Sequence, residues 1–235
     1  MRSSDSINNV EIAAGEISAR LLSLESFTTE SIRALRREFS KRLAKSPPRF
    51  VVEVALLLLD KRTMEHRFVA YELVCHHRRA LASLDEKDIR LFGTGIDNWG
   101  SVDMFACYLV GPAWRENQIP DKLVHSWARS GNRWWRRAAL VSTVPLNSKA
   151  RGGSGDAART LVVCASLVAD RDDMVVKALS WALRELSKRD PEAAEQFLDE
   201  HQSVLASRVL REVRNKLSTG LKNPRLRDAG KVHWK

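Results

Sequence analysis

The sequence predicts an all-α protein, an α-solenoid or superhelix of antiparallel helix pairs. Apolar residues recur with a helical period along nearly the whole chain. No stretch alternates apolar and polar residues with the β-branched enrichment of a strand. Only 11 Gly and 7 Pro occur in 235 residues, and Leu, Ala, Arg, Glu and Val dominate, a composition that favours helices.

The spacing of the predicted helices indicates HEAT-like repeats. About a dozen helices of about 10–17 residues, joined by short loops, favour antiparallel pairs. A pair about every 40 residues matches HEAT-type repeats. The repeats share no residue signature, so this inference depends on element spacing. Stacked pairs bury a continuous core and leave one concave face, which we expect to be basic.

The first predicted helix spans residues 10–24, with Ile12, Ile17, Leu21 and Leu24 on one apolar face. Proline and capping residues delimit the helices that follow, because proline stops a helix and short polar side chains start one. These helices are, in order: one capped by Thr28 or Thr29 and stopped by Pro47-Pro48, 50–59, 64–81, one capped by Asp85-Glu86-Lys87-Asp88, and 99–109, ending near Gly111-Pro112.

The second half of the chain continues the pattern around one flexible loop at residues 149–155, which contains three glycines. Its predicted helices are 120–128 with Pro120 in the first turn, 134–144 capped by Asn132, 156–169, 173–188, 192–199 after the Asp190-Pro191 start signal, and 203–217.

The predicted repeat domain is residues 10–217, between a disordered N-terminal tail at 1–9 and a basic C-terminal tail at 218–235. The residues Cys75, Cys107 and Cys164 lie in apolar helical runs, which indicates buried free thiols in a reducing compartment. Residues 1–9 lack the apolar core of a signal peptide. The longest uncharged apolar run, residues 54–59, is far short of a membrane span. We therefore expect a cytoplasmic protein.

The chain is strongly basic, with a formal net charge of +10 and a pI of about 9.9. This balance raises the expectation of a polyanionic partner such as nucleic acid. An anionic membrane, or solubility alone, would also account for it.

The first candidate segment is Asn132 through Val141, with Arg133, Arg136 and Arg137 in the first turns of a helix. A helix start offers free N–H groups to a phosphate. Cations there oppose the helix dipole, so an anionic partner is a reasonable explanation. Alternatively, Arg137 faces inward to a buried carboxylate.

The second candidate segment contains Trp99 and Asp103, which are four residues apart and therefore share a helix face. A carboxylate beside core positions needs a partner, because unpaired burial is costly. That partner could be Arg137, which would make Asp103 a structural residue instead of a catalytic one.

The third candidate segment places Lys177, Trp181 and Arg184 on one face at i, i+4 and i+7. An aromatic side chain between two cations suits contact with a sugar-phosphate backbone. The alternative is a core tryptophan whose neighbours extend their charges to solvent.

Other patterns are weaker. Cys75-His76-His77 lacks a second ligand pair at zinc spacing, so we expect no metal. The glycines at 152–155 follow no strand and do not form a nucleotide-phosphate motif. On the last helix, Arg208, Arg211 and Arg214 form a cationic stripe that is solvated or makes a further phosphate contact.

In this order, the segments 99–103, 132–141 and 177–185 resemble the AlkD-type DNA alkylation-repair family of HEAT-like repeat DNA glycosylases. The resemblance in organisation covers residues 10–217. It implies excision of cationic N3- and N7-alkylated purines from duplex DNA, without cofactor, by a protein we expect to be a monomer with no membrane partner. The family's functional tryptophans, aspartate and arginine fall on Trp99, Trp181, Asp103 and Arg137.

The resemblance assigns Asp103 the catalytic role and Trp99 and Trp181 contact with the backbone at the lesion. Arg137 would bind phosphate, supported by Arg133, Arg136, Lys177 and Arg184. The chain departs from the family at Gly100, where an acid is common. Two alternatives stay open: a non-catalytic module that recognises damaged or branched DNA, and a protein-interaction scaffold.

Overall fold

The computed structural model describes residues 9–224, and every regular element in that range is a helix, which confirms the predicted all-α class. The chain divides into two compact units, residues 1–119 and 120–235. Residues 1–8 and 225–235, which include most of the two predicted tails, lie outside the described residues. Within the described part, no helix is both long and apolar enough to cross a membrane.

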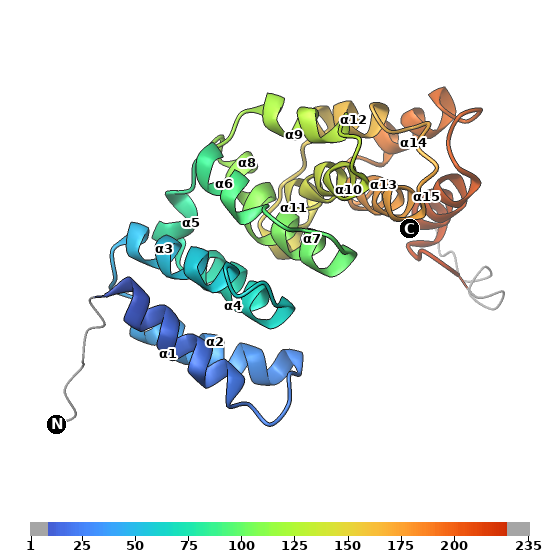
Figure 1. Ribbon diagram of the computed structural model, residues 1–235. Coiled ribbons are helices and arrows are strands. Elements are labelled where there is room, and N and C mark those ends of the chain that lie inside the picture. Colours follow the sequence, from blue (N-terminus) through green and yellow to red (C-terminus); the bar gives the residue numbers. More distant parts are fainter. Residues whose placement is uncertain (1–8, 225–235) are drawn as a thin grey trace. The chain divides into compact units, whose positions relative to one another are not determined.

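Unit 1 consists of helix pairs arranged in two layers (Figure 1). Helix α1 packs on α3, α2 packs on α4, and α4 also contacts α7, so α2, α4 and α7 follow one another in one layer. The elements of this unit are α1 (Val10–Leu22), α2 (Thr29–Arg42), α3 (Pro48–Leu59), α4 (Met64–His76), α5 (Arg78–Ala82), α6 (Glu86–Phe92), α7 (Trp99–Phe105), the π-helix η1 (Ala106–Val110) and α8 (Gly111–Arg115).

Unit 2 repeats the two-layer arrangement. Helices α10, α13 and α15 pack side by side, and α9, α12 and α14 cover them (Figure 1). The elements of this unit are α9 (Asp121–Ala128), α10 (Arg133–Ser142), α11 (Val144–Asn147), the 3-10 helix η2 (Lys149–Arg151), α12 (Ala157–Ala165), α13 (Asp173–Leu186), α14 (Pro191–Glu200) and α15 (Ser207–Thr219).

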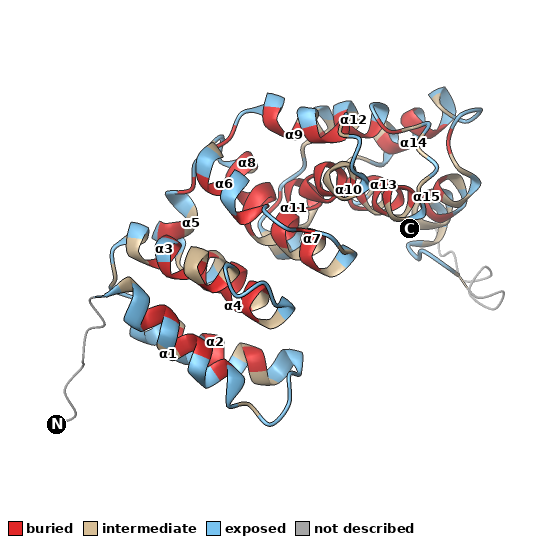
Figure 2. Cartoon of the chain, in the orientation of Figure 1, coloured by how far each residue is buried: buried red, intermediate tan, exposed pale blue. Residues whose placement is uncertain are grey.

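Buried residues line the facing sides of the helices in each unit, while the outward sides are exposed (Figure 2). In unit 1 the largest fully buried side chains include Trp114, Tyr71 and Phe39. Burying an aromatic side chain removes a large apolar area from water, so these rings are a main source of the unit's stability.

Several helix starts are where the sequence predicts them. Thr28, Asp85, Asn132 and Asp190 each accept a hydrogen bond from a backbone N–H in the first turn of the helix that follows. Such capping satisfies donors that have no partner inside the helix. Local sequence therefore determines these boundaries.

Other expectations were wrong. The helix predicted for residues 64–81 breaks at His77, whose extended backbone ends α4 and whose Nδ1 accepts from the Ala80 N–H to start α5. Ile12, predicted on the apolar face of α1, is exposed, because the buried face runs through Ala13, Ile17 and Leu21. Cys107 and Cys164 are buried as predicted, but Cys75 is only half-buried.

The helix predicted to end near Gly111-Pro112 instead continues to Arg115 through the π-helical turn η1. There the Gly111 N–H donates to the Ala106 carbonyl five residues earlier. A π-turn lengthens the hydrogen-bond step by one residue, so the chain passes Pro112, which has no N–H, without ending the helix.

Candidate nucleic-acid interface

The loop that precedes α7 is fixed by a buried arginine in α4. Arg67 donates from Nη2 to the Thr94 carbonyl at 3.0 Å and from Nη1 to the Tyr71 hydroxyl at 2.7 Å. Gly95, with φ of 71°, takes the left-handed conformation that glycine adopts without strain. The loop is therefore held firmly against α4, which sets where α7 begins.

Trp99 and Asp103 occupy the first and second turns of α7. Asn98 caps the helix by accepting from the Ser101 N–H at 3.0 Å, and Ser101 returns a contact to the Asn98 backbone. Trp99 is 62% exposed, and Asp103 is half-buried one turn later. Unit 1 thus presents an indole in solvent with a carboxylate on the same helix face.

Gly100 lies in a tight place beside these two residues. A Cβ atom added there would come within 3.3 Å of the Asn98 Oδ1 atom and 3.4 Å of the Met64 Cε atom. The first of these atoms is the cap acceptor of α7. A larger side chain would therefore press on the cap, so glycine suits the close approach.

An ion-pair network that sequence reasoning missed joins α2, α4 and η1. Glu72 is buried and accepts from Arg33 Nε at 2.8 Å and from Arg36 Nε at 3.1 Å. Arg33 also donates to the Tyr108 hydroxyl at 3.3 Å. The hydrogen bond to Glu72 is the largest cause of a raised pKa at Arg33. No short-range sequence pattern signals this network, because each bonded pair in it is 36 or more residues apart.

Unit 2 contains the other candidates, and Arg137 is the most buried of them. It is only 6% exposed, and its Nη1 donates to the Met174 carbonyl at 2.6 Å. This hydrogen bond joins the first half of α10 to the start of α13. Arg137 therefore faces the neighbouring helix and contributes to packing, whatever else it binds.

Arg133 and Arg136 both pair with carboxylates of the loop before α13. Arg136 Nε is 2.7 Å from Asp170 Oδ2, and its Nη1 donates to the Ser130 and Gly131 carbonyls at 3.0 Å each. Arg133 pairs more loosely with Asp172, at 3.4 Å, and is 52% exposed. Arg136 is thus a largely buried brace, while Arg133 remains accessible.

On α13, Lys177 and Arg184 also differ in exposure to solvent. Lys177 is 42% exposed and forms an ion pair with Asp173 at 2.6 Å. Arg184 is mostly buried, and its Nε donates to the Ser180 hydroxyl at 3.2 Å. Burial lowers the pKa of Arg184 from its usual value. Arg184 Nε also lies 3.9 Å from the Glu212 carboxylate of α15, so this side chain links α13 to α15.

The structure thus brings six predicted residues together on α10 and α13 of unit 2, and two on α7 of unit 1. The six are Arg133, Arg136, Arg137, Lys177, Trp181 and Arg184. Trp181 is half-buried. Sequence reasoning missed the carboxylates Asp170, Asp172 and Asp173 that bind several of these cations, although the acidic run itself was a visible signal.

Cavities and clusters of metal ligands are two further kinds of candidate site. A cavity of about 730 Å³ in unit 1 lies between α3 and the loop that leads into α7, lined by Leu56, Leu57, Met64, Arg67 and Asn98 among others. Among residues 9–224, no group of three or more His, Cys, Asp or Glu side chains is arranged to hold a metal ion.

The chain is similar to a known protein family and to a solved structure. The model of a family described as DNA alkylation repair enzyme matches residues 26–217. A solved structure titled a predicted DNA alkylation repair enzyme from Enterococcus faecalis superposes with a TM-score of 0.65 and is 19% identical. That alignment covers 88% of this chain and 95% of the other, and it supports the fold. No curated protein matches the chain.

Proposed function

The chain belongs to the DNA alkylation repair enzyme family, and we propose that it is a DNA glycosylase that excises cationic N3- and N7-alkylated purines from duplex DNA. The observation that carries the proposal is the pair on α7: an exposed indole, Trp99, one turn before the half-buried carboxylate of Asp103. A carboxylate and an exposed indole on one helix face are groups that can stabilise a sugar cation and contact a DNA backbone.

The chemistry of this reaction needs few groups. An N7-alkylated purine is already cationic, so its departure needs no general acid. Breaking the N-glycosidic bond leaves positive charge on the deoxyribose. The Asp103 carboxylate would stabilise that charge and orient the attacking water. The Trp99 indole face would favour the same cationic character. Trp181, in unit 2, would contact the DNA backbone.

Phosphate binding falls to the cations of unit 2. A guanidinium can hold a phosphate through paired hydrogen bonds, whereas an ammonium acts as a point charge. Arg133 and Lys177 are the accessible members of the set. Arg137 would anchor a phosphate from its fixed place between α10 and α13. Arg136 and Arg184, both mostly buried, would support these contacts indirectly.

The test is the release of free 7-methylguanine from methylated duplex DNA, measured together with duplex affinity. We expect the wild-type protein to release the base. Asp103→Asn should abolish release and leave affinity nearly unchanged, because the amide keeps the shape but loses the charge. Glu53→Gln is the matched control: it removes the charge of an exposed acid on α3 that should not be needed for release.

The outcomes separate the proposal from its alternatives. Equal release by Asp103→Asn and wild type would contradict the catalytic assignment. Salt-dependent duplex binding without release of any alkylated purine would identify a recognition module, because phosphate contacts release counterions whether or not chemistry follows. Absence of salt-dependent binding would indicate a protein-interaction scaffold.

A further inference from the structure

An acidic loop in unit 2 binds several of the cations proposed to contact DNA. This segment, residues 170–173, leads into α13, and Asp173 is the first residue of that helix. Asp170 pairs with Arg136 at 2.7 Å and Asp172 with Arg133 at 3.4 Å. Asp173 pairs with Lys177 at 2.6 Å. Each cation proposed to bind phosphate, except the buried Arg137 and Arg184, therefore pairs with one of these carboxylates.

Asp173 differs from the other two acids because it pairs with cations of two helices, α13 and α15. Its Oδ1 is 3.2 Å from the Nη1 atom of Arg208, in the first turn of α15. One turn later on α15, the Glu212 carboxylate accepts from the Ser180 hydroxyl at 2.6 Å. These two contacts show that α13 and α15 run in the same direction. Arg208 therefore lies at the same end of its helix as Lys177 does of α13.

The charge around Asp173 is dominated by cations. Its pKa is lowered, first by the hydrogen bond from Lys177 and further by the charges of Lys177, Arg208 and Arg137. Two of these side chains, Lys177 and Arg208, contact the carboxylate directly, so two cations share this one acid. Such a cluster has an excess of positive charge once the carboxylate is neutralised or moves away.

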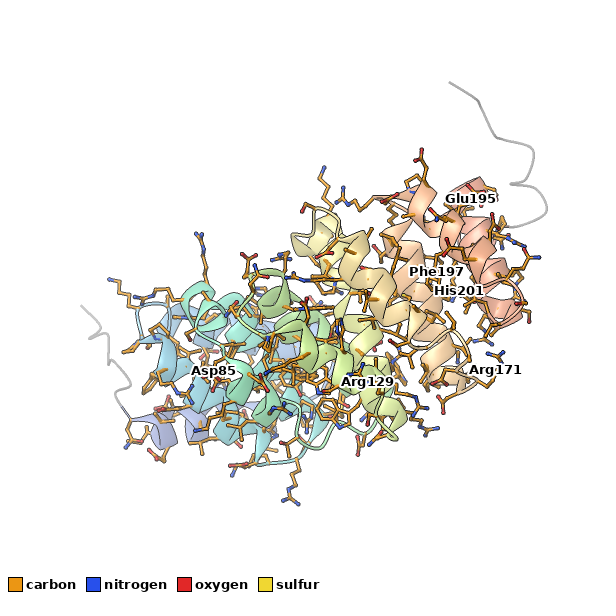
Figure 3. The ribbon with its side chains drawn as sticks, turned by 90° about the horizontal axis from the view of Figure 1, so that it is seen from above. Asp85, Arg129, Arg171, Glu195, Phe197 and His201 are labelled. Atoms are coloured by element: carbon orange, nitrogen blue, oxygen red, sulfur yellow. The ribbon has the colours of Figure 1, made fainter. Side chains whose placement is uncertain are left out.

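The backbone on which Asp173 sits is fixed. Arg171, labelled in Figure 3, donates from Nη2 to the Val204 carbonyl at 2.7 Å, which holds the loop to the segment before α15. Asp170 Oδ1 accepts from the Asp172 N–H at 2.9 Å. The start of α13 and the start of α15 are therefore held together independently of the Asp173 side chain.

Exposure distinguishes which ion pairs can exchange partners. The Asp170–Arg136 pair is largely buried, whereas Asp173 is 54% exposed and both of its cations are accessible. Exposed ion pairs contribute little to stability because water solvates their members. A phosphate offers the same kind of acceptor oxygens as a carboxylate. It can therefore replace Asp173 at little cost, while Arg136 keeps its partner.

We propose that Asp173 occupies the place of a DNA phosphate in the free protein, and that duplex DNA displaces its carboxylate so that Lys177 and Arg208 together bind the phosphate. This inference rests on the proposed function only in that it requires duplex DNA as the ligand. It adds Arg208 to the interface and makes Asp173 a competitor that weakens binding to DNA.

Duplex binding by the full chain, titrated against salt with an unmodified duplex, tests the contribution of Arg208. Losing one phosphate contact should reduce the slope of log K against log salt by about 0.9. We expect this of Arg208→Ala, with Arg208→Lys restoring the wild-type slope. Lys122→Ala is the matched control: it removes an exposed cation from α9, at the end of that helix away from the turn into α10.

The same assay at constant salt tests the competition. Asp173→Asn should bind the duplex more tightly, by up to about fivefold, which is the range expected for an exposed ion pair. Glu195→Gln, an exposed acid on α14 in the outer layer (Figure 3), removes the same charge and should change affinity less. An unchanged slope in Arg208→Ala, or unchanged or weaker binding by Asp173→Asn, would overturn the inference.

Failure of this inference is distinguishable from failure of the proposed function. A wild-type protein that binds duplex DNA but releases no alkylated base leaves these slopes and affinities fully interpretable. A wild-type protein without salt-dependent duplex binding overturns both.

Discussion

The Nη1 atom of Arg137 donates a hydrogen bond to the backbone oxygen of Met174 at 2.6 Å, which joins α10 to α13 inside unit 2. Arg137 is therefore an element of packing as well as a proposed phosphate anchor. The sequence left two possibilities for this residue, an outward contact or an inward one. The hydrogen bond to Met174 and the 6% exposure show that it faces inward to α13.

Replacing Arg137 by Met should therefore lower stability as well as DNA affinity. The hydrogen bond between the charged guanidinium and the Met174 carbonyl would be lost, and a hydrogen bond of a charged group contributes about 1.5–3 kcal/mol. Urea unfolding measures this difference in the free energy of unfolding. Arg133→Met is the control, because Arg133 is accessible and loosely paired and its loss should cost much less. Equal stability of the two variants would contradict a packing role for Arg137.

Glu72→Ala should strongly destabilise unit 1. Glu72 is buried and holds both Arg33 and Arg36, and removing it would leave Arg36 buried without that partner. Breaking a buried ion pair costs about 3–5 kcal/mol, because one charge stays desolvated. Chemical denaturation measures the loss. In Glu53→Ala, which breaks only an exposed pair with Arg49, the change should stay below about 1 kcal/mol.

Gly15→Ala should stabilise the protein by about 0.5–1 kcal/mol, because alanine loses less backbone entropy than glycine inside a helix. Gly15 is exposed within α1, and an added Cβ would meet nothing within 4 Å. Gly153→Ala is the opposite case, since its Cβ would collide with the backbone of Pro145 and Leu146. The midpoint temperature of thermal unfolding should rise for Gly15→Ala and fall for Gly153→Ala.

Stability should fall as the pH drops below about 6.5, the ordinary histidine pKa. Burial is the largest cause of a lowered pKa at His66, His76 and His77. A histidine whose folded pKa is depressed favours the neutral form in the folded state. Its contribution is present above the unfolded pKa and is lost as the pH falls through the folded pKa.

The midpoint of thermal unfolding, measured between pH 7.5 and pH 5, checks this expectation. Gln in place of His66 cannot titrate, so His66→Gln should show a smaller drop over the same interval. His66 is a suitable choice because its ring nitrogens are hydrogen-bonded to Ser18 and Thr63, at 2.8 Å each. A drop of the same size in the variant and the wild type would exclude a contribution from His66.

Much of the fold could be predicted because its signals are local. The period of apolar residues along one helix and the caps at Asn132 and Asp190 depend on neighbours within a few positions. The helix end near Gly111-Pro112 was mispredicted because the continuation depends on a π-turn, and no simple residue pattern specifies that hydrogen-bond step.

In the candidate site, too, local relationships could be predicted and long-range ones could not. Helix periodicity predicted that Trp99 and Asp103 share a face, and the structure places them in the first two turns of α7. The partners of the cations could not be predicted, because Arg136 and Asp170 are 34 residues apart and Arg208 and Asp173 are 35 apart by number. Such pairs depend on which helices become neighbours.

By itself, the sequence determined the helical class, most helix starts and the residue types available for chemistry, because these depend on the backbone and on side chains a turn away. Only the tertiary structure decided that Arg137 faces α13, that Arg136 and Arg184 are braces, and that Asp173 holds Lys177 and Arg208. The physical reason is that burial and ion pairing depend on which surfaces meet when helices pack. A charge pattern along the chain cannot specify those surfaces.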